Sequence, residues 1–562
     1  MFKQKKKSFK EAVTASLVSQ RRDRQNMAEP NHKLHVAVFP WLALGVEIRE
    51  LSRSGFWLRR RTFLFGGGRP ALSPGSGGSF NTSFAGFCLR EVVASLVLLS
   101  PRFWIDCRRL IMLSISQIRQ SLMTYRLELS GGRSLIATKG HTISFISTPR
   151  NIARLPKTPS INFVSLPLPH AVDNNLPENA ESTTDVPETH IGYLKKAFDG
   201  LSEPFSEFLQ ASKPDWIVYD ILHYWVPPIA EKLGVRCALF CTFNAASIIV
   251  INGPSSIMIN GRDPRKTVED LMDPPPWVPF ETNVAYRLFE ARRIMEYPTA
   301  GVTGAELNDS YRTGLAYAGS EVIAIRTCTE LESEWNQLLG EIQGKPVIPL
   351  GLLPATTTDD DVDDDIREWL DTQRAKSVVY VALGTEVTVS EKEIQGLAHG
   401  LELSGLPFFW TIRKASVFLP DGFEERVKGR EVVRAEWVPQ GRILSHGSVG
   451  GFVTHCGWGS VVEGLTFGVP LIMFPCNLDQ PLVARMLAGM NIGREIPRNE
   501  RDGSFTSVSV AETIRLVVVE EEGKIYRDNA ASMQKKVFGD KRLQDQYVDS
   551  FIKFLENQRA GM

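Results

Sequence analysis

Short apolar runs alternate with longer amphipathic stretches along most of the chain. Such runs occur at residues 34–40, 141–147, 216–219 and 237–240, and again at 377–383, 407–412, 450–454 and 470–474. An apolar run followed by a helix-length amphipathic stretch is typical of strand–helix–strand units, whose strands lie parallel. Because the pattern restarts after about residue 355, it predicts an α/β protein with two facing Rossmann-like domains. Ligands of such sheets bind at the carboxyl ends of the strands, so we expect a binding cleft between the domains.

An acidic, turn-rich segment, 354–369, separates the two halves. Its composition predicts a solvated linker. We therefore expect an N-terminal domain over 27–353 and a C-terminal domain over 370–562, whose last helix could pack back on the N-terminal domain. Residues 1–26 contain eight Lys or Arg and two acidic residues, and a natural start follows at Met27. This composition predicts a disordered basic leader and not a targeting signal.

Charge and cysteine content argue against several classes of function. Lys and Arg together number 64, as do Asp and Glu, so we expect neither nucleic acid nor an anionic membrane as a partner. The longest candidate membrane segment, 92–100, is too short to span a bilayer. Seven scattered cysteines without CxxC spacing predict reduced thiols in a cytoplasmic protein that binds no metal. We expect a monomer.

The segment 437–480 contains the residue types that a nucleotide sugar needs. The aromatic ring of Trp437 can stack on a flat base, and the carboxylate of Glu463 can accept hydrogen bonds from two ribose hydroxyls. Between them, GGFVTHCGWGS leads from an apolar strand through a glycine-rich turn into a helix that we expect to begin near Ser460. This arrangement directs backbone N–H groups and the positive end of a helix toward an anion, such as a diphosphate.

The segment ends with Asp479 and Gln480, a carboxylate and an amide that suit sugar hydroxyls. Almost from end to end it resembles the donor-binding signature of plant family-1 UDP-sugar glycosyltransferases, which have the GT-B fold. The resemblance implies that the N-terminal domain binds a small-molecule hydroxyl acceptor and that the C-terminal domain binds a UDP-sugar co-substrate, without metal or other cofactor. It implies these donor-binding residues: Thr385, Trp437, Gln440, His455, Gly457, Trp458, Gly459, Ser460, Glu463, Asp479 and Gln480.

One position of the signature departs from the family. The family usually has HCGWNS, whereas Gly459 replaces the Asn here. The loss of one side-chain amide is expected to weaken donor binding by roughly 0.5–1.5 kcal/mol, the usual net contribution of a hydrogen bond.

The resemblance also narrows the sugar and the acceptor. The family most often pairs Gln480 with glucose donors, but the flanking sequence, including 494–505, resembles a branch of UDP-rhamnose rhamnosyltransferases and glycoside-extending transferases. We therefore expect transfer of rhamnose or glucose to a flavonoid or terpenoid glycoside. The aromatic and apolar residues at 277–297 fit either an acceptor pocket or a packed helix, and the sequence does not separate the two.

The catalytic base of the family is missing from its usual position. Residues 34–45 resemble the family's first strand and the start of its loop, but Gly45 is followed by Val46 where a His is expected. The family pattern resumes near Ser134. The 88 residues between, 46–133, contain 13 Arg and no Lys, which favours translated non-coding sequence over a true insertion.

The resemblance implies an inverting mechanism in which a His takes the acceptor's proton and an Asp orients that His. Asp220, just past the predicted strand 216–219, occupies the position of this Asp. His223 is the nearest candidate for a substitute base, whereas His35 is expected within a strand. Two hypotheses stay open: an inverting UDP-glycosyltransferase whose sequence carries a spurious insert, and a UDP-sugar-binding pseudoenzyme. A phosphorylase or epimerase of the same fold would not need the 437–480 segment.

Overall fold

The computed structural model describes residues 33–40, 140–155, 159–169, 175–296, 307–354, 364–384, 389–412, 418–436 and 438–559. The predicted leader, the segment 46–133 and linker residues 355–363 lie outside these ranges. Within them, every helix is too short or too polar to traverse a lipid bilayer.

Seven strands of the described residues form the first sheet, all parallel, in the order β3-β2-β1-β4-β5-β6-β7. They are β1 (His35–Phe39), β2 (Thr142–Ser147), β3 (Ile161–Ser165), β4 (Trp216–Tyr219), β5 (Arg236–Cys241), β6 (Val322–Ile325) and β7 (Val347–Pro349). In β1, Val36 lies opposite Ile143 of β2 and Trp216 of β4. The inner strands are buried on both faces, which explains their continuous apolar sequences.

Six further strands form the second sheet, also parallel, in the order β10-β9-β8-β11-β12-β13. They are β8 (Val378–Ala382), β9 (Phe408–Thr411), β10 (Glu431–Arg434), β11 (Val449–Thr454), β12 (Leu471–Met473) and β13 (Gly493–Glu495). Glycine lets β11 approach its neighbour, because a Cβ added at Gly450 would lie 2.0 Å from the carbonyl oxygen of Lys376. The strand that leads to the predicted donor site is therefore held tightly against β8.

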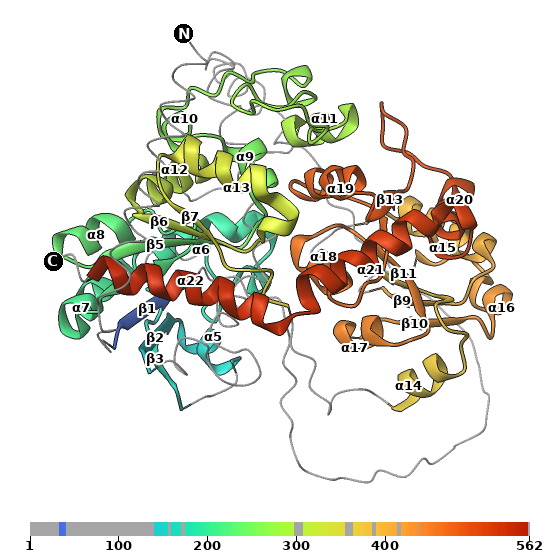
Figure 1. The fold of residues 1–562 in the computed structure, drawn as a ribbon, viewed down its shortest axis with the longest axis horizontal. Helices are drawn as coiled ribbons and strands as arrows, with labels where there is room; N and C mark the ends of the chain where they lie inside the picture. Colours follow the sequence, from blue (N-terminus) through green and yellow to red (C-terminus); the bar gives the residue numbers. More distant parts are fainter. Residues whose placement is uncertain are drawn as a thin grey trace, which may run out of the picture.

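Helices cover both sheets (Figure 1). Those of the first half are α5 (Pro149–Ala153), α6 (Ile191–Asp199), α7 (Ser202–Ser212), α8 (Val226–Lys232), α9 (Ala245–Asn252), α10 (Ser255–Asn260), α11 (Leu288–Glu296), α12 (Asp309–Gly319) and α13 (Thr329–Gln343). Those of the second half are α14 (Asp364–Asp371), α15 (Glu391–Ser404), α16 (Phe423–Val427), α17 (Gln440–Ser445), α18 (Trp458–Thr466), α19 (Gln480–Gly489), α20 (Ser507–Val518), α21 (Lys524–Phe538) and α22 (Lys541–Arg559).

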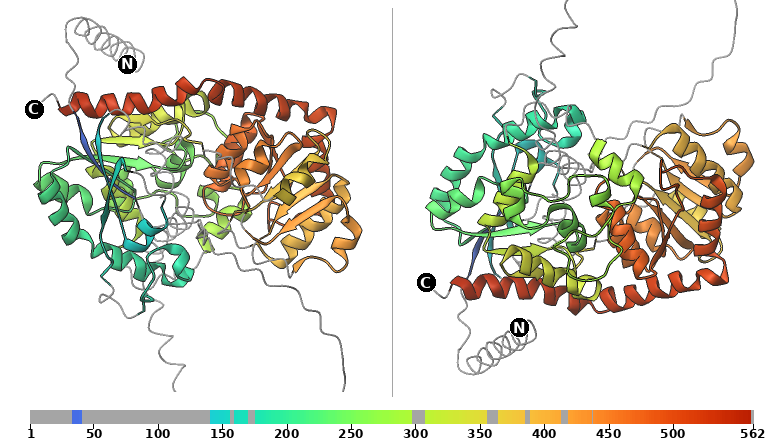
Figure 2. Two further views of the ribbon diagram at one scale, coloured as in Figure 1. Left: turned by 90° about the horizontal axis from the view of Figure 1, so that it is seen from below. Right: turned by 90° about the horizontal axis from the view of Figure 1, so that it is seen from above.

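The long C-terminal helix α22 returns from the second sheet and lies along the first (Figures 1 and 2). The indole Nε1 of Trp216 donates to the carbonyl oxygen of Leu555 at 3.1 Å. Apolar residues of α22 join the core beside the first sheet: Val548, Phe551, Ile552 and Leu555. Burial of one such side chain contributes roughly 1.5–3 kcal/mol, so α22 ties the two halves of the molecule together.

The linker expected over 354–369 is too long at its C-terminal side. Helix α14 begins at Asp364, and its Ile366 and Leu370 are only 1% and 2% exposed. Trp369 packs against Phe409 of β9, with ring centroids 6.3 Å apart. Residues 364–369 therefore belong to the second sheet's unit, since their apolar side chains cover one of its faces. The acidic composition concealed this apolar stripe.

The loops at the carboxyl end of the first sheet contact helices α18 and α19, which follow strands of the second sheet. Asn244 follows β5, and its Nδ2 donates to Sδ of Met486 on α19 at 3.6 Å. Arg326 follows β6, and its carbonyl oxygen accepts from the indole Nε1 of Trp458 at 2.8 Å. The prediction of two facing Rossmann-like domains is therefore confirmed, and the segment 454–480 lies where they meet.

Candidate donor-binding site

The turn between β11 and α18 is built around an unusual backbone conformation. Cys456 has φ +65°, a left-handed conformation that a non-glycine residue adopts rarely. This turn starts α18 at Trp458, two residues before the predicted Ser460, with Gly457 as N-cap and no side-chain cap. The first N–H that bonds back to Gly457 is that of Val461, at 3.0 Å. The preceding N–H groups lie at the positive end of the helix, where they can bind an anion.

The imidazole of His455 is held between two glycines. It is 9% exposed. A Cβ added at Gly384, in the loop after β8, would lie 2.8 Å from the ring, and a Cβ at Gly457 would lie 2.4 Å from its Nε2. Both distances are shorter than any ordinary contact, so this position of the ring requires glycine on both sides. The sequence analysis did not select Gly384, although Gly384 directly precedes the predicted residue Thr385. Thr385 itself lies outside the described residues.

The carboxylate of Glu463, on α18, is held by Gln440, which is in turn contacted by Tyr380. Gln440 donates through Nε2 to Oε2 of Glu463. Its side-chain oxygen, Oε1, accepts from the hydroxyl of Tyr380 at 3.4 Å. Glu463 is partly exposed, so its second carboxylate oxygen can accept from a ligand. Gln440 therefore supports Glu463, a role that the linear motif did not reveal. Trp437, the predicted base-stacking residue, lies outside the described residues.

Asp479 and Gln480 lie at the start of α19. The side-chain oxygen of Gln480 accepts from the backbone N–H groups of Cys476 and Asn477, at 3.0 and 2.9 Å. Its NH₂ group therefore remains the part that can donate to a ligand. Burial raises the pKa of the Asp479 carboxyl to about 7, which brings its titration into the physiological range. The preceding residue, Leu478, has φ +41°, so this loop is also conformationally strained.

Three of the predicted donor-binding residues lie in the first turn of α18. The indole of Trp458 is 4% exposed and bonded to Arg326 of the first domain, which leaves its backbone N–H as the group that could meet a ligand. Gly459 and Ser460 follow in the first turn of α18. The Ser460 side chain is 1% exposed.

Asp220 follows β4 directly, at the carboxyl edge of the first sheet. It is 3% exposed, and its Oδ1 accepts from the N–H of Ile221 at 2.6 Å. Pro40, the last described residue after β1, precedes the position at which the family's His is expected. Asp220 therefore lies at the same edge of the first sheet as Asn244 and Arg326, which contact the second domain.

His223 lacks the properties of a catalytic base. Its ring is fully buried between Phe39 and Phe198, with centroid distances of 4.9 and 4.7 Å. Burial lowers its pKa to about 3, against the opposing effect of the backbone carbonyls of Asp220 and Pro40. A base with this pKa takes up protons poorly near neutral pH. His35 hydrogen-bonds to Ser144 Oγ at 2.9 Å within the first sheet, as expected for a strand residue.

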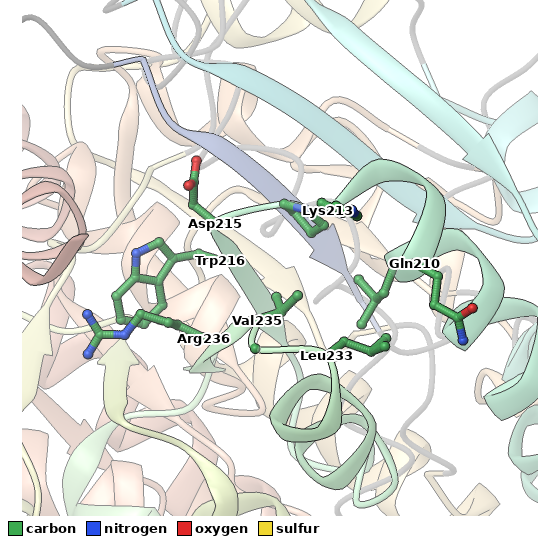
Figure 3. A pocket seen from close by; sticks show the side chains of 10 residues that line it. Gln210, Lys213, Asp215, Trp216, Leu233, Val235 and Arg236 are labelled. Carbon is green, nitrogen blue, oxygen red and sulfur yellow. The ribbon is translucent and has the colours of Figure 1, made fainter. Parts of the chain in front are cut away.

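A separate hollow of about 630 Å³ lies away from these residues (Figure 3). It is lined by residues at the amino ends of β4 and β5, including Trp216 and Arg236, whose guanidinium lies 4.5 Å from the indole centroid. The amino ends are opposite the edge at which ligands of parallel sheets bind. We therefore place the candidate site at residues 454–480 and not in this hollow. Among the described side chains, His, Cys, Asp and Glu form no group of three that could hold a metal ion.

Comparison with known proteins shows the family. Residues 345–543 match the family model described as UDP-glucoronosyl and UDP-glucosyl transferase. UDP-glycosyltransferase 91B1 of Arabidopsis thaliana is 66% identical over 546 residues, which cover 95% of this chain and all of the relative. Soyasaponin III rhamnosyltransferase of Glycine max is 40% identical over 441 residues, covering 76% of this chain and 91% of the relative.

Two solved structures share the fold. Phytolacca americana UGT2, complexed with UDP-2fluoro-glucose and pterostilbene, has a TM-score of 0.61 at 23% identity, covering 77% of this chain and 96% of that chain. Os79 from O. sativa, in complex with UDP, has a TM-score of 0.61 at 20% identity, covering 75% and 95%. These likenesses show the architecture of two facing Rossmann-like domains.

Proposed function

Since the chain belongs to the plant family-1 UDP-glycosyltransferases, we propose that it moves rhamnose or glucose from a UDP-sugar to a hydroxyl group of a plant specialised-metabolite glycoside, with inversion at the anomeric carbon. The single observation that carries this proposal is the arrangement at the carboxyl edge of the second sheet. There, His455 and the N-terminus of α18 follow β11, Glu463 lies on α18, and the Asp479–Gln480 pair follows β12.

Each part of the donor has a matching group. The diphosphate would lie at His455 and the first N–H groups of α18, because both can donate hydrogen bonds to an anion. The ribose would bind Glu463, which Gln440 holds in place. The sugar would receive a hydrogen bond from the NH₂ of Gln480 and give one to Asp479. Trp437 and Thr385 would complete the site at the base and the phosphates.

The transfer step joins the acceptor oxygen to the anomeric carbon while the bond from that carbon to the UDP oxygen breaks. The electron pair of the broken bond leaves with UDP, and the proton of the acceptor hydroxyl passes to a base. Asp220 would orient a His base in the correct tautomer and stabilise its positive charge. General-base catalysis contributes on the order of 10²- to 10⁴-fold in rate.

The choice of sugar and acceptor rests on the relatives. The Glycine max relative is named as a rhamnosyltransferase of soyasaponin III. At 40% identity, this relative supports rhamnose as an alternative to glucose as the transferred sugar. For the acceptor we propose a glycoside of the flavonoid or terpenoid class.

A pseudoenzyme that binds UDP-sugar without transfer is the second candidate, and the sequence after Gly45 favours it. The alignment with the Glycine max relative leaves about a quarter of this chain unmatched but less than a tenth of the relative. The unmatched share is about as long as residues 1–133. The match to this relative therefore lacks a stretch about as long as residues 1–133, whereas the Arabidopsis relative aligns over 95% of this chain.

The experiment compares the chain with a version in which residues 46–133 are replaced by the short His-containing loop that the family pattern has at this position. We expect both proteins to bind UDP in calorimetry, and the second to transfer sugar at least about 10²-fold faster. Products are measured by mass spectrometry with UDP-glucose or UDP-rhamnose and a panel of plant glycosides. Equal turnover of the two versions would refute the role assigned to the missing His. Absence of UDP binding in both would refute the proposed function.

A further inference from the structure

The Asp479–Gln480 pair is bracketed by two backbone carbonyls that are both held by other residues. The hydroxyl of Tyr286, which is 5% exposed, donates to the carbonyl oxygen of Leu478 at 2.8 Å. The guanidinium of Arg485 donates through Nη1 to the carbonyl oxygen of Pro481 at 3.0 Å. One hydrogen bond thus fixes the residue before the pair and another fixes the residue after it.

Both hydrogen bonds lead to the same segment of the first domain. Arg485 is itself bonded through Nη2 to Oε2 of Glu290 at 2.6 Å, and both side chains are less than 10% exposed. The N–H of Arg287 donates to the same oxygen of Glu290 at 2.8 Å, which fixes the carboxylate at the start of α11. Tyr286 precedes α11 by two residues. Residues 286–290 therefore hold the residue before the pair through Tyr286, and the residue after it through Glu290 and Arg485.

This segment is firmly attached to the second domain. The N–H of Phe289 donates to the carbonyl oxygen of Glu500 at 3.1 Å, and Arg498 lies over the Phe289 ring at 5.2 Å. Helix α11 and helix α19 are neighbours in all three views, although α11 belongs to the first half of the chain (Figures 1 and 2). The sequence segment that fitted either an acceptor pocket or a packed helix thus serves, in α11, to join the domains.

We propose that Tyr286 and Glu290 are positioning residues for sugar recognition: the first domain sets the place of Asp479 and Gln480 relative to the diphosphate turn. The inference rests on the proposed function. It follows because the loop is strained at Leu478, with φ +41°, and a strained loop keeps its conformation only where its surroundings hold it. The diphosphate turn is held by other contacts, those of His455 with Gly384 and Gly457 and that of Trp458 with Arg326.

The test uses the full chain and measures two dissociation constants by calorimetry, for UDP and for whichever of UDP-glucose and UDP-rhamnose the unmodified protein binds more tightly. Tyr286→Phe removes the hydroxyl and keeps the ring. We expect the ratio of the UDP-sugar Kd to the UDP Kd to rise about two- to tenfold, the effect of one hydrogen bond, while the UDP Kd stays within twofold. Glu290→Gln removes one of the two carboxylate charges that pair with Arg485, the other being that of Glu495 at 3.2 Å, and is expected to act in the same direction.

Tyr219→Phe is the matched control. Its hydroxyl is also buried and donates to a backbone carbonyl, that of Ala316 at 2.6 Å, but within the first domain. It loses the same type of hydrogen bond, so its melting temperature shows the general cost, and its Kd ratio should equal that of the unmodified protein.

The outcomes are distinct. An unchanged ratio in Tyr286→Phe and Glu290→Gln, with UDP bound normally, overturns the positioning role and leaves the proposed function intact. Equal weakening of UDP and UDP-sugar also overturns it, because the residues would then support the whole site. Failure of the unmodified chain to bind UDP overturns the proposed function and this inference with it.

Discussion

Replacement of Gly457 by Ala is expected to weaken UDP binding through the His455 ring alone. The added Cβ would lie 2.4 Å from Nε2 of His455 and 3.1 Å from Cε1, so the imidazole must move. Gly384 also lies against the ring, since a Cβ there would come within 2.8 Å of it. The backbone at Gly457 has φ −60°, which alanine adopts without strain.

The magnitude follows from the bond that would be lost. A hydrogen bond to a charged group contributes about 1.5–3 kcal/mol, which corresponds to a roughly 10- to 150-fold increase in the Kd of UDP. Gly457 is also the N-cap of α18, where Ala is less favourable than Gly by several tenths of a kcal/mol. That second effect lowers the melting temperature and leaves the Kd of the folded protein unchanged.

The assay is calorimetric titration with UDP, accompanied by thermal unfolding. Gly447→Ala is the control, since a Cβ at Gly447 meets no atom within 4 Å, and it should bind UDP as the unmodified protein does. If Gly457→Ala binds UDP within twofold of Gly447→Ala, His455 does not contact the diphosphate and the site is placed wrongly.

Three further variants test separate parts of the account. In the unmodified protein, the Asp479 carboxyl keeps its proton up to a pKa of about 7 when folded but releases it near 3.8 when unfolded. The free energy of unfolding therefore falls as pH rises through this window. Asp479→Asn should remove this contribution and flatten the pH dependence of stability. Melting curves are measured between about pH 4 and about pH 8, and equal slopes for the two proteins would contradict this prediction. Gly459→Asn restores the family's amide and should lower the UDP-sugar Kd about two- to tenfold. An unchanged Kd in calorimetry would argue that no part of the bound UDP-sugar lies within reach of residue 459. Asp220→Asn, made in the version with the His-containing loop, should reduce kcat by about 10²- to 10⁴-fold without change in the UDP Kd. Steady-state kinetics checks this, and full activity would remove Asp220 from the mechanism.

Most of the strands that the sequence predicted are buried on both faces, although β6 (Val322–Ile325), which is equally buried, was missed. The apolar runs that predicted β1, β2, β4, β5, β8, β9, β11 and β12 agree with the observed bounds to within one or two residues. The missed strands include β10 (Glu431–Arg434), which is partly exposed throughout, and β13 (Gly493–Glu495), whose sequence GRE has no apolar side chain. Such edge strands exist because a neighbouring strand supplies hydrogen-bond partners, and their own residues give no periodic signal.

The residues of the candidate donor site also fall into those that the sequence could reveal and those that it could not. His455, Glu463, Asp479 and Gln480 lie within one contiguous segment, so a linear pattern sufficed to select them. Tyr286 and Arg326 meet that segment from more than 130 residues away, and no spacing rule connects them. The linker prediction was wrong at 364–369 because acidic residues on one face of α14 concealed a buried apolar stripe on the other.

The most direct test is a structure of the protein determined with UDP. The account predicts density for the diphosphate within hydrogen-bonding distance of His455 and the first N–H groups of α18, with the ribose at Glu463 and the base at Trp437. Density at the hollow lined by Trp216 and Arg236, or no density at saturating UDP, would contradict it.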